Sequence, residues 1–407
     1  MDSQQTSVFS NGLLWFGAGI SIAEILTGML LSPLGWEKGL WAIFIGHIIG
    51  GAVMLGAGIM GARSRCSAME TVSFSFGKEG ARFFAGINVI QLIGWTAVMI
   101  VSAAAAAEII VPLGMALWDL IIGALIALWI IMGMTTLGRV NVLVMTALFL
   151  LTAVLSGTIF GADTAAAPSG TITFGGAVEL AVAMPLSWLP VISDYTREAE
   201  KPVKATVVSC LTYFAASSWM FVIGMGAALF TGESDIAKIM LGAGLGVSAI
   251  VIILLSTVTT TFLDAYSAGV SGRALTTCLS EKGQALIATA LGTLLAITVD
   301  ASRFEDFLYF IGSVFAPMTA IMLADYFFIH ENHQKERVSV LKLLIWAIGF
   351  GLYRYLLNAD TPLGVTFPVI VAVMVMDVVV SKIVGQSKNR ATLLFNMLLI
   401  GRPKYTD

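Results

Sequence analysis

The sequence predicts an all-α integral membrane protein with twelve transmembrane helices, and three observations carry this prediction. Of the 407 residues, 58% are hydrophobic and only 12% are charged, whereas soluble proteins have about 25% charged residues. The mean hydropathy is +0.92, so the chain has more apolar surface than it can bury within itself, and lipid must cover the rest. Finally, twelve segments approach the roughly 20 apolar residues that cross a bilayer.

The twelve predicted segments leave only short connections between them, so we expect one transmembrane domain over residues 1–407 and no soluble domain. The ninth segment is the shortest. In chain order the segments are residues 12–33, 39–62, 82–107, 115–137, 140–161, 176–193, 205–231, 243–270, 284–299, 305–329, 338–357 and 362–384.

The basic residues predict the orientation. With the N-terminus in the cytoplasm, most of the 22 lysines and arginines fall in cytoplasmic loops or in the tail 385–407, as the positive-inside rule requires. No basic residue is then expected inside a span. The polar start MDSQQTSVFSNG lacks the basic opening of a signal peptide. We therefore expect both termini in the cytoplasm and a chain that stays in the cell inner membrane.

Neither nucleic-acid binding nor a cysteine metal site is expected. The net charge is only −3, and the three cysteines, Cys66, Cys210 and Cys278, are far apart in the sequence. The charge gives no reason to expect a nucleic-acid partner. The cysteines lack metal-ligand spacing and are expected as free thiols.

The first and sixth segments carry helix-breaking residues where no water can compensate. The sixth reads AVAMPLSWLPVISDY, with Pro185 and Pro190, and each proline removes a backbone donor. The first reads LWFGAGISIAEILTG and is rich in glycine, which weakens a helix by about 1 kcal/mol relative to alanine. Glycine in a membrane helix can also serve close packing alone. Paired breaks of this kind build the substrate sites of transporters with inverted repeats.

The second break comes five spans after the first, so we expect two repeats. Residues 12–161 form the first and residues 176–329 the second, and 338–384 supplies two additional helices. Non-helical backbone at this depth is tolerated only where it is buried or lines a cavity.

Gln91 and Trp95 share a helix face in the third segment, because they are four residues apart. A planar heterocycle could stack on the indole while the amide reads its edge, and Trp188 of the sixth segment could cover the other side. The alternative is that tryptophan marks the membrane interface, which fits Trp15, Trp36, Trp41 and Trp118.

The eighth segment reads LSTVTTTFLDAYSAG and offers Ser256, Thr259 and Thr260 as hydroxyl ligands for a small cation. Such hydroxyls can also bond their own helix or join helices. Ionisable groups within spans are costly and are functional candidates. Glu24 and Asp264 could bind the edge of an aminopyrimidine, and one of them could carry a proton. Other buried groups are expected to be structural, namely Glu179, Asp194 and Asp325 near span ends, and a packed His47.

Several motifs in order resemble the nucleobase–cation symporter family, which includes cytosine permease, bacterial hydantoin transporters and fungal purine and uracil permeases. They are SFSFGKEG, QLIGW, SDYTRE, TVTTTFLDAYSAG and ADYFF. The stretches SNGLLWFGAGISIAEILTG and MPLSWLPVISDYTREAEKP are most similar to the hydroxymethylpyrimidine permease branch.

The resemblance implies the leucine-transporter fold, with five-plus-five inverted repeats and alternating access. It places the stacking tryptophan at Trp95, the substrate segment at Pro185 to Trp188 with Ser187 between them, and Ile20 against the ligand. It places the cation-binding carbonyls near Phe16 and Gly19. An asparagine common in the family is missing late in the eighth segment, Pro185 occupies the usual aromatic position, and Glu24 lacks a counterpart in cytosine permease. These departures favour a ligand with an amine or hydroxymethyl group.

We therefore expect a monomeric secondary transporter in the lipid bilayer that imports a small pyrimidine-type heterocycle, hydroxymethylpyrimidine first, with Na⁺ or H⁺ as the coupling ion and no cofactor. The alternatives are a permease for cytosine or another nucleobase and an amino-acid transporter of the same fold. An enzyme is not expected, because a lipid-modifying enzyme would need clustered metal-binding carboxylates at a membrane edge.

Overall fold

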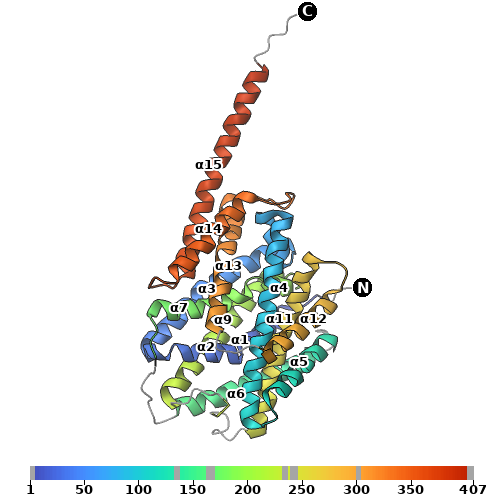
Figure 1. Ribbon diagram of the computed structural model, residues 1–407, viewed down its shortest axis with the longest axis vertical. Helices are drawn as coiled ribbons and strands as arrows, with labels where there is room; N and C mark the ends of the chain where they lie inside the picture. The colour runs from blue at the N-terminus through green and yellow to red at the C-terminus, as the bar shows by residue number, and fades with distance from the viewer. Residues whose placement is uncertain are drawn as a thin grey trace, which may run out of the picture.

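The computed structural model describes residues 5–132, 138–161, 170–231, 237–238, 246–298 and 304–400, and these form a bundle of helices (Figure 1). In chain order the elements are α1 (Val8–Gly19), α2 (Ile22–Leu30), η1 (Ser32–Leu34), α3 (Trp36–Ser64), α4 (Ala68–Ile110), α5 (Met115–Met132), α6 (Gly138–Phe160), α7 (Phe174–Trp188), α8 (Ile192–Thr196), α9 (Pro202–Gly226), η2 (Ala227–Thr231), α11 (Gly246–Leu275), α12 (Glu281–Thr298), α13 (Phe304–Ala324), η4 (Asp325–Ile329), α14 (Val340–Leu356) and α15 (Thr366–Ile400). The long helix α15, red in Figure 1, extends well beyond the others.

Each of the twelve predicted segments coincides with one of these helices or with a pair of them. Parts of the fourth, eighth and ninth segments, and the tail residues 401–407, lie outside the described residues. Within the described chain, eight helices are long and apolar enough to cross a membrane, and the bent pair α1–α2 makes a ninth. The all-helical membrane fold is therefore confirmed, while the count of twelve spans and the two repeats stay predictions.

The predicted break in the first span is present. Helices α1 and α2 are bent by 49° relative to each other, and Ile20 between them has non-helical backbone angles. Ser21 starts α2, and its side chain accepts a hydrogen bond from the Glu24 backbone N–H at 3.3 Å. The carbonyl end of α1 and the N–H end of α2 consequently meet inside the bundle, where helix ends carry partial charges of opposite sign.

The sixth span is interrupted between Trp188 and Ile192, at Pro190, whereas Pro185 lies inside α7 and does not end that helix. The backbone around Pro190, which has no N–H, leaves carbonyls without helical partners, because the Val191 and Asp194 N–H groups donate to the Trp188 and Val191 carbonyls instead. Amides of α4 cover two of them: Gln91 Nε2 donates to the Ser187 carbonyl at 3.4 Å, and Asn88 Nδ2 donates to the Pro190 carbonyl at 3.2 Å. The bundle itself, and not water, compensates this break.

The connection predicted as a loop at residues 63–81 is largely helical. A capping box between Ser67 and Glu70 starts α4 at Ala68. Gly77 bends the helix with a φ of +72°, which a residue with a side chain adopts only at a cost. The predicted segments 39–62 and 82–107 mark only the apolar spans, and this does not exclude a helix in the connection before the second of them.

Glycines allow α2 and α9 to pack with their backbones nearly touching. A methyl group on Gly28 would lie 2.6 Å from Phe221 Cα, and one on Gly224 would lie 2.8 Å from the Ile25 carbonyl carbon. Small residues at such crossings are typical of membrane bundles. This close approach brings Glu24 of α2 against the polar side chains of α9.

Two surface assignments from the sequence are wrong. Trp15 is fully buried, with its ring 5.4 Å from that of Trp188, and Trp118 is also buried, although both were expected at the membrane interface. Trp36 and Trp41 are 36% and 57% exposed, consistent with that position. Hydropathy cannot distinguish a tryptophan that faces lipid from one in the protein core.

Candidate functional site

A small internal cavity lies where the two interrupted spans meet α4 and α11. Its volume is about 20 Å³, and it is lined by Ala18, Ser21, Ala23, Glu24, Trp95, Met99, Met184, Ser187, Trp188, Thr260 and Asp264. A cavity needs about 10–15 Å³ to hold one water molecule. The site is therefore closed in this structure, and a ring can enter only after its walls separate.

Five of the predicted substrate residues line this cavity together: Glu24, Trp95, Ser187, Trp188 and Asp264. They come from α2, α4, the end of α7 and α11, so residues up to 240 positions apart in sequence converge on one point. Thr260, predicted as a cation ligand, lines it as well.

Three predicted substrate residues lie behind the wall. Gln91 is buried and holds Asn88 and the Ser187 carbonyl, while its Oε1 has no hydrogen-bond partner in the described structure. Pro185 packs against Gly50 of α3. Ile20 forms the break between α1 and α2, and its carbonyl accepts a hydrogen bond from Ser256. These residues shape the site without lining the cavity.

Aromatic rings form two sides of the site. Trp95 packs edge-on against Phe307, with 5.5 Å between ring centroids. Trp188 is held by Trp15 and by Tyr213, at 5.4 and 6.3 Å. Edge-to-face packing of this kind fixes ring orientation, so both indoles are supported from behind.

The two carboxyl groups differ in how they are satisfied. Glu24 accepts a hydrogen bond from Tyr213 Oη at 2.6 Å and lies 2.8 Å from Ser217 Oγ, both on α9. Asp264 is 3% exposed, and no donor in the described part of the chain bonds its carboxyl group. A buried carboxyl group without a partner is costly. A ligand in the cavity that donates a hydrogen bond to Asp264 would remove this cost.

Hydroxyls of α11 reach the carbonyl end of α1. Ser256 Oγ donates to the Ile20 carbonyl at 2.7 Å, and Thr260 Oγ1 donates to the Gly17 carbonyl at 3.2 Å. Thr259 instead donates to Leu255 and Ser256 carbonyls of its own helix. Backbone carbonyls at broken helices, together with hydroxyls, are the oxygens that coordinate Na⁺ in transporters.

The carbonyls predicted as cation ligands, those of Phe16 and Gly19, are near α11, but no hydroxyl of α11 bonds them in the described structure. The Phe16 carbonyl accepts from the Ile20 backbone N–H at 3.1 Å, and Gly19 packs against Ala216 of α9. The carbonyls that face α11 are those of Gly17 and Ile20. Successive residues of a helix point about 100° apart, so an error of one position in a sequence comparison selects a carbonyl that faces another helix.

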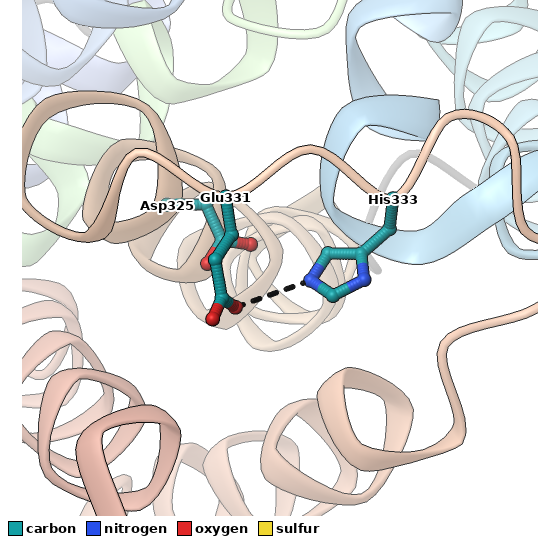
Figure 2. Close-up of side chains that lie close together, drawn as sticks. All are labelled: Asp325, Glu331 and His333. Atoms are coloured by element: carbon teal, nitrogen blue, oxygen red, sulfur yellow. Dashed lines mark hydrogen bonds and ion pairs between the residues drawn. The ribbon is translucent and has the colours of Figure 1, made fainter. Parts of the chain in front are cut away.

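A second polar cluster lies at the end of η4. Asp325, Glu331 and His333 place ligand atoms within 4.8 Å of one another (Figure 2). Lys342 already provides a cation there, because its Nζ lies 2.5 Å from Asp325 Oδ1 and 2.7 Å from Asp377 Oδ1. We interpret the cluster as an ion network that is buried at Lys342, Asp325 and Asp377 and exposed at Glu331. Lys342 is 1% exposed and lies inside the predicted segment 338–357, contrary to the expectation that no basic residue lies inside a span.

The other carboxyl groups expected to be structural have hydrogen-bond partners in the protein. Glu179 accepts from Tyr353 Oη, from the Thr366 hydroxyl and from the backbone N–H groups of Val365 and Thr366. Asp194 accepts from the Ala68 backbone N–H at 3.0 Å. These groups tie α7 to α15 and α8 to α4.

Sequence reasoning missed the residues that support the site. Asn88, Tyr213 and Ser217 were not singled out, although each is a fully buried polar side chain. Asn88 had a usable signal, since it lies three residues before Gln91 on the same helix face. Tyr213 and Ser217 lie in a segment without charged residues and gave no local signal.

Comparison with known proteins now assigns the family. Residues 3–384 match the family model described as a permease for cytosine/purines, uracil, thiamine and allantoin. The chain belongs to this family. The permease is accordingly a multi-pass membrane transporter of the nucleobase–cation symporter family rather than an enzyme.

Relatives and solved structures agree with this assignment. The permease is 25% identical to the cytosine permease of Escherichia coli (strain K12) over 351 residues, which cover 84% of this chain and 82% of that protein. Its fold is similar to that of Mhp1, a nucleobase-cation-symport-1 family transporter in a closed conformation with bromovinylhydantoin bound. The TM-score is 0.78, with 18% identity and 94% of each chain covered.

A Na⁺-coupled sialic acid symporter shares the fold with a TM-score of 0.68 and 14% identity, over 92% of this chain and 88% of that one. The leucine-transporter type of fold predicted from the sequence is thus supported at the level of overall architecture.

Proposed function

We propose that this permease imports a pyrimidine-type heterocycle, hydroxymethylpyrimidine first, together with a cation by alternating access. The observation that carries the proposal is the cavity in which Trp95 and Trp188 lie beside Asp264 and Glu24. Flat nitrogen heterocycles need such a combination of ring faces and hydrogen-bonding groups. The family description, with its pyrimidines, purines and thiamine, is consistent with it.

Each side chain has a role in this proposal. Trp95 stacks on the ring, and Trp188 covers the other side. Asp264 accepts from an exocyclic amine, because this carboxyl group is 3% exposed, lines the cavity and is bonded by no donor in the described part of the chain. Glu24 and the Ser187 hydroxyl complete the polar edge.

Residues behind the wall act on the ligand through their neighbours. Gln91 holds the Ser187 carbonyl in place, and its free Oε1 becomes available if α7 moves. Ile20 forms the first helix break, and Pro185 lies inside α7, three residues before its end, where it packs against Gly50 of α3.

The coupling cation is proposed to be Na⁺, bound between α1 and α11. Its proposed ligands are the hydroxyls of Ser256, Thr259 and Thr260 and carbonyls at the end of α1, those of Phe16 and Gly19. We add the carbonyls of Gly17 and Ile20, because Thr260 and Ser256 already donate to them. Because Thr260 also lines the cavity, cation and ring would stabilise the same closed state. Each then raises the affinity for the other.

The finer architecture belongs to the same proposal. Residues 12–161 and 176–329 form two inverted repeats of five spans, and 338–384 adds two helices. The monomer lies in the cell inner membrane with both termini, including the tail 385–407, in the cytoplasm.

Cytosine is the second candidate substrate, because the curated relatives are cytosine permeases at 24–25% identity. Its exocyclic amine could reach Asp264 in the same way. Nothing in the family description supports the amino-acid alternative.

Binding measurements on the purified protein test the proposal. Thermal shift and calorimetry with hydroxymethylpyrimidine, cytosine, uracil, allantoin, thiamine and leucine, each with and without Na⁺, should show tightest binding of an aminopyrimidine. Asp264→Asn should reduce binding of aminopyrimidines more than that of uracil. Binding of leucine alone, or equal binding of all the heterocycles, would contradict the proposal.

A further inference from the structure

Behind the cavity, three buried side chains form a chain of hydrogen bonds that substrate binding does not explain. Glu24 Oε2 lies 2.8 Å from Ser217 Oγ, and Ser217 Oγ lies 2.6 Å from His47 Nε2. His47 Nδ1 lies 2.9 Å from the Ile43 carbonyl. The three residues come from α2, α9 and α3, and each is at most 1% exposed.

The hydrogen bonds among these three side chains require one more proton than a neutral imidazole and an ionised carboxylate provide. The Ile43 carbonyl can only accept, so Nδ1 of His47 carries a hydrogen. Ser217 has one hydroxyl hydrogen for two contacts, toward His47 Nε2 and toward Glu24 Oε2. With a neutral imidazole and an ionised carboxylate, one of these contacts would bring two lone pairs together at 2.6 or 2.8 Å. One additional proton satisfies both contacts.

We propose that Glu24, Ser217 and His47 form a binding site for one exchangeable proton, which is shared between Glu24 and His47 through the Ser217 hydroxyl. With the proton on Glu24, the Oε2–H group donates to Ser217, which donates to Nε2. Transfer breaks the Oε2–H and the original Oγ–H bonds and forms new Oγ–H and Nε2–H bonds. The imidazolium then donates to Ser217, which donates to the carboxylate.

The net charge of the site is zero in both arrangements and −1 when the proton is lost. A net buried charge without a partner is strongly disfavoured. The neighbouring titratable groups do not replace the proton. Tyr213 donates to the other oxygen of Glu24, and Asp264 across the cavity would add a second negative charge.

Access to this proton is one-sided. Glu24 lines the cavity, whereas the His47 ring packs against Phe214 and Phe221, at 6.1 and 4.9 Å between centroids. Water can reach the site through Glu24 when the cavity opens. The proton would therefore exchange on whichever side of the membrane the cavity faces, which couples it to transport. This inference rests on the proposed transport function for its role, although the proton site itself does not.

Two neighbouring serines provide a matched test. Ser217→Ala removes both contacts of the chain, whereas Ser218→Ala removes a hydroxyl that has no hydrogen-bond partner in the described structure. In proteoliposomes with equal Na⁺ concentrations inside and outside, a proton gradient directed inward should drive accumulation of labelled hydroxymethylpyrimidine by the unchanged protein and by Ser218→Ala. Ser217→Ala should lose this accumulation while still binding hydroxymethylpyrimidine. Equal pH-driven accumulation by both variants would overturn the inference.

A measurement without substrate separates this inference from the proposed function. Infrared difference spectra during a pH titration should show either a protonated carboxyl group that disappears in Glu24→Gln or an imidazolium that disappears in His47→Asn. A carboxylate together with a neutral imidazole at every pH at which the protein stays folded would contradict the proton site. Failure of all the heterocycles to bind would instead contradict the proposed function. The infrared spectra would still show whether the proton site exists, because they are measured without substrate.

Discussion

Replacing Trp95 by alanine is expected to weaken binding of an aminopyrimidine by roughly 5- to 150-fold. The range follows because stacking of a base on an aromatic side chain contributes about 1–3 kcal/mol, and each 1.4 kcal/mol corresponds to tenfold in affinity. Trp188 remains on the other side of the cavity, so binding should be weakened and not abolished.

The substitution also removes a buried side chain, and that effect needs its own control. Replacing a core tryptophan by alanine costs about 3–5 kcal/mol of stability in soluble proteins. Trp118 is as buried as Trp95, both being 6% exposed, but it lies outside the cavity and donates to the Val111 carbonyl. Trp118→Ala should therefore cause a similar loss of thermal stability without a loss of affinity.

Titration calorimetry on purified protein, with hydroxymethylpyrimidine and cytosine as ligands, measures the effect directly. Trp95→Phe keeps an aromatic face and should recover most of the lost affinity. The reasoning is refuted if Trp95→Ala and Trp118→Ala bind with the same affinity as the unchanged protein, or if both lose affinity equally.

Three further substitutions test other parts of the structure. Thr260→Ala should weaken the Na⁺ dependence of binding without changing the fold, and an unaltered Na⁺ titration would move the cation elsewhere. Lys342→Met leaves two buried carboxylates facing each other, so thermal unfolding in detergent should show a loss of about 3–5 kcal/mol, whereas Lys382→Met on the exposed side of α15 should show none. Gly28→Ala should cost about 1–3 kcal/mol through overpacking against α9, while Gly351→Ala, which has open space around it, should be tolerated; equal stability of the two would refute the close approach of α2 and α9.

The broken helices could be predicted from the sequence because their causes are local. Pro185 and Pro190 lack backbone donors wherever the segment lies, and a glycine-rich stretch weakens a helix in any surroundings. The same holds for Gln91 and Trp95, whose common face follows from helical geometry alone. The position of α4's first turns was missed because a short polar helix has no hydropathy signal.

Partners across the bundle could not be predicted, because they depend on how helices pack. The Tyr213–Glu24 and Ser217–Glu24 contacts join residues 189 and 193 positions apart. No local sequence pattern shows that these residues lie close together in the bundle. Trp15 and Lys342 show the same limit. Tryptophan and lysine are common at the membrane–water interface, but the structure buries both residues. Packing gives Trp15 aromatic neighbours and gives Lys342 two carboxylates.

The two breaks are compensated in chemically different ways, and this difference favours α1 as the place where the cation acts. Side-chain amides hold the free carbonyls after α7, and an N–H donor cannot coordinate a cation. Hydroxyls of Ser256 and Thr260 hold the carbonyls at the end of α1, and a hydroxyl oxygen keeps lone pairs that can face an ion. A cation at α1 would replace two direct hydrogen bonds by ion–oxygen contacts that involve the same atoms. Because Thr260 also lines the cavity, that exchange alters the cavity wall itself, which is the physical link that coupled transport requires.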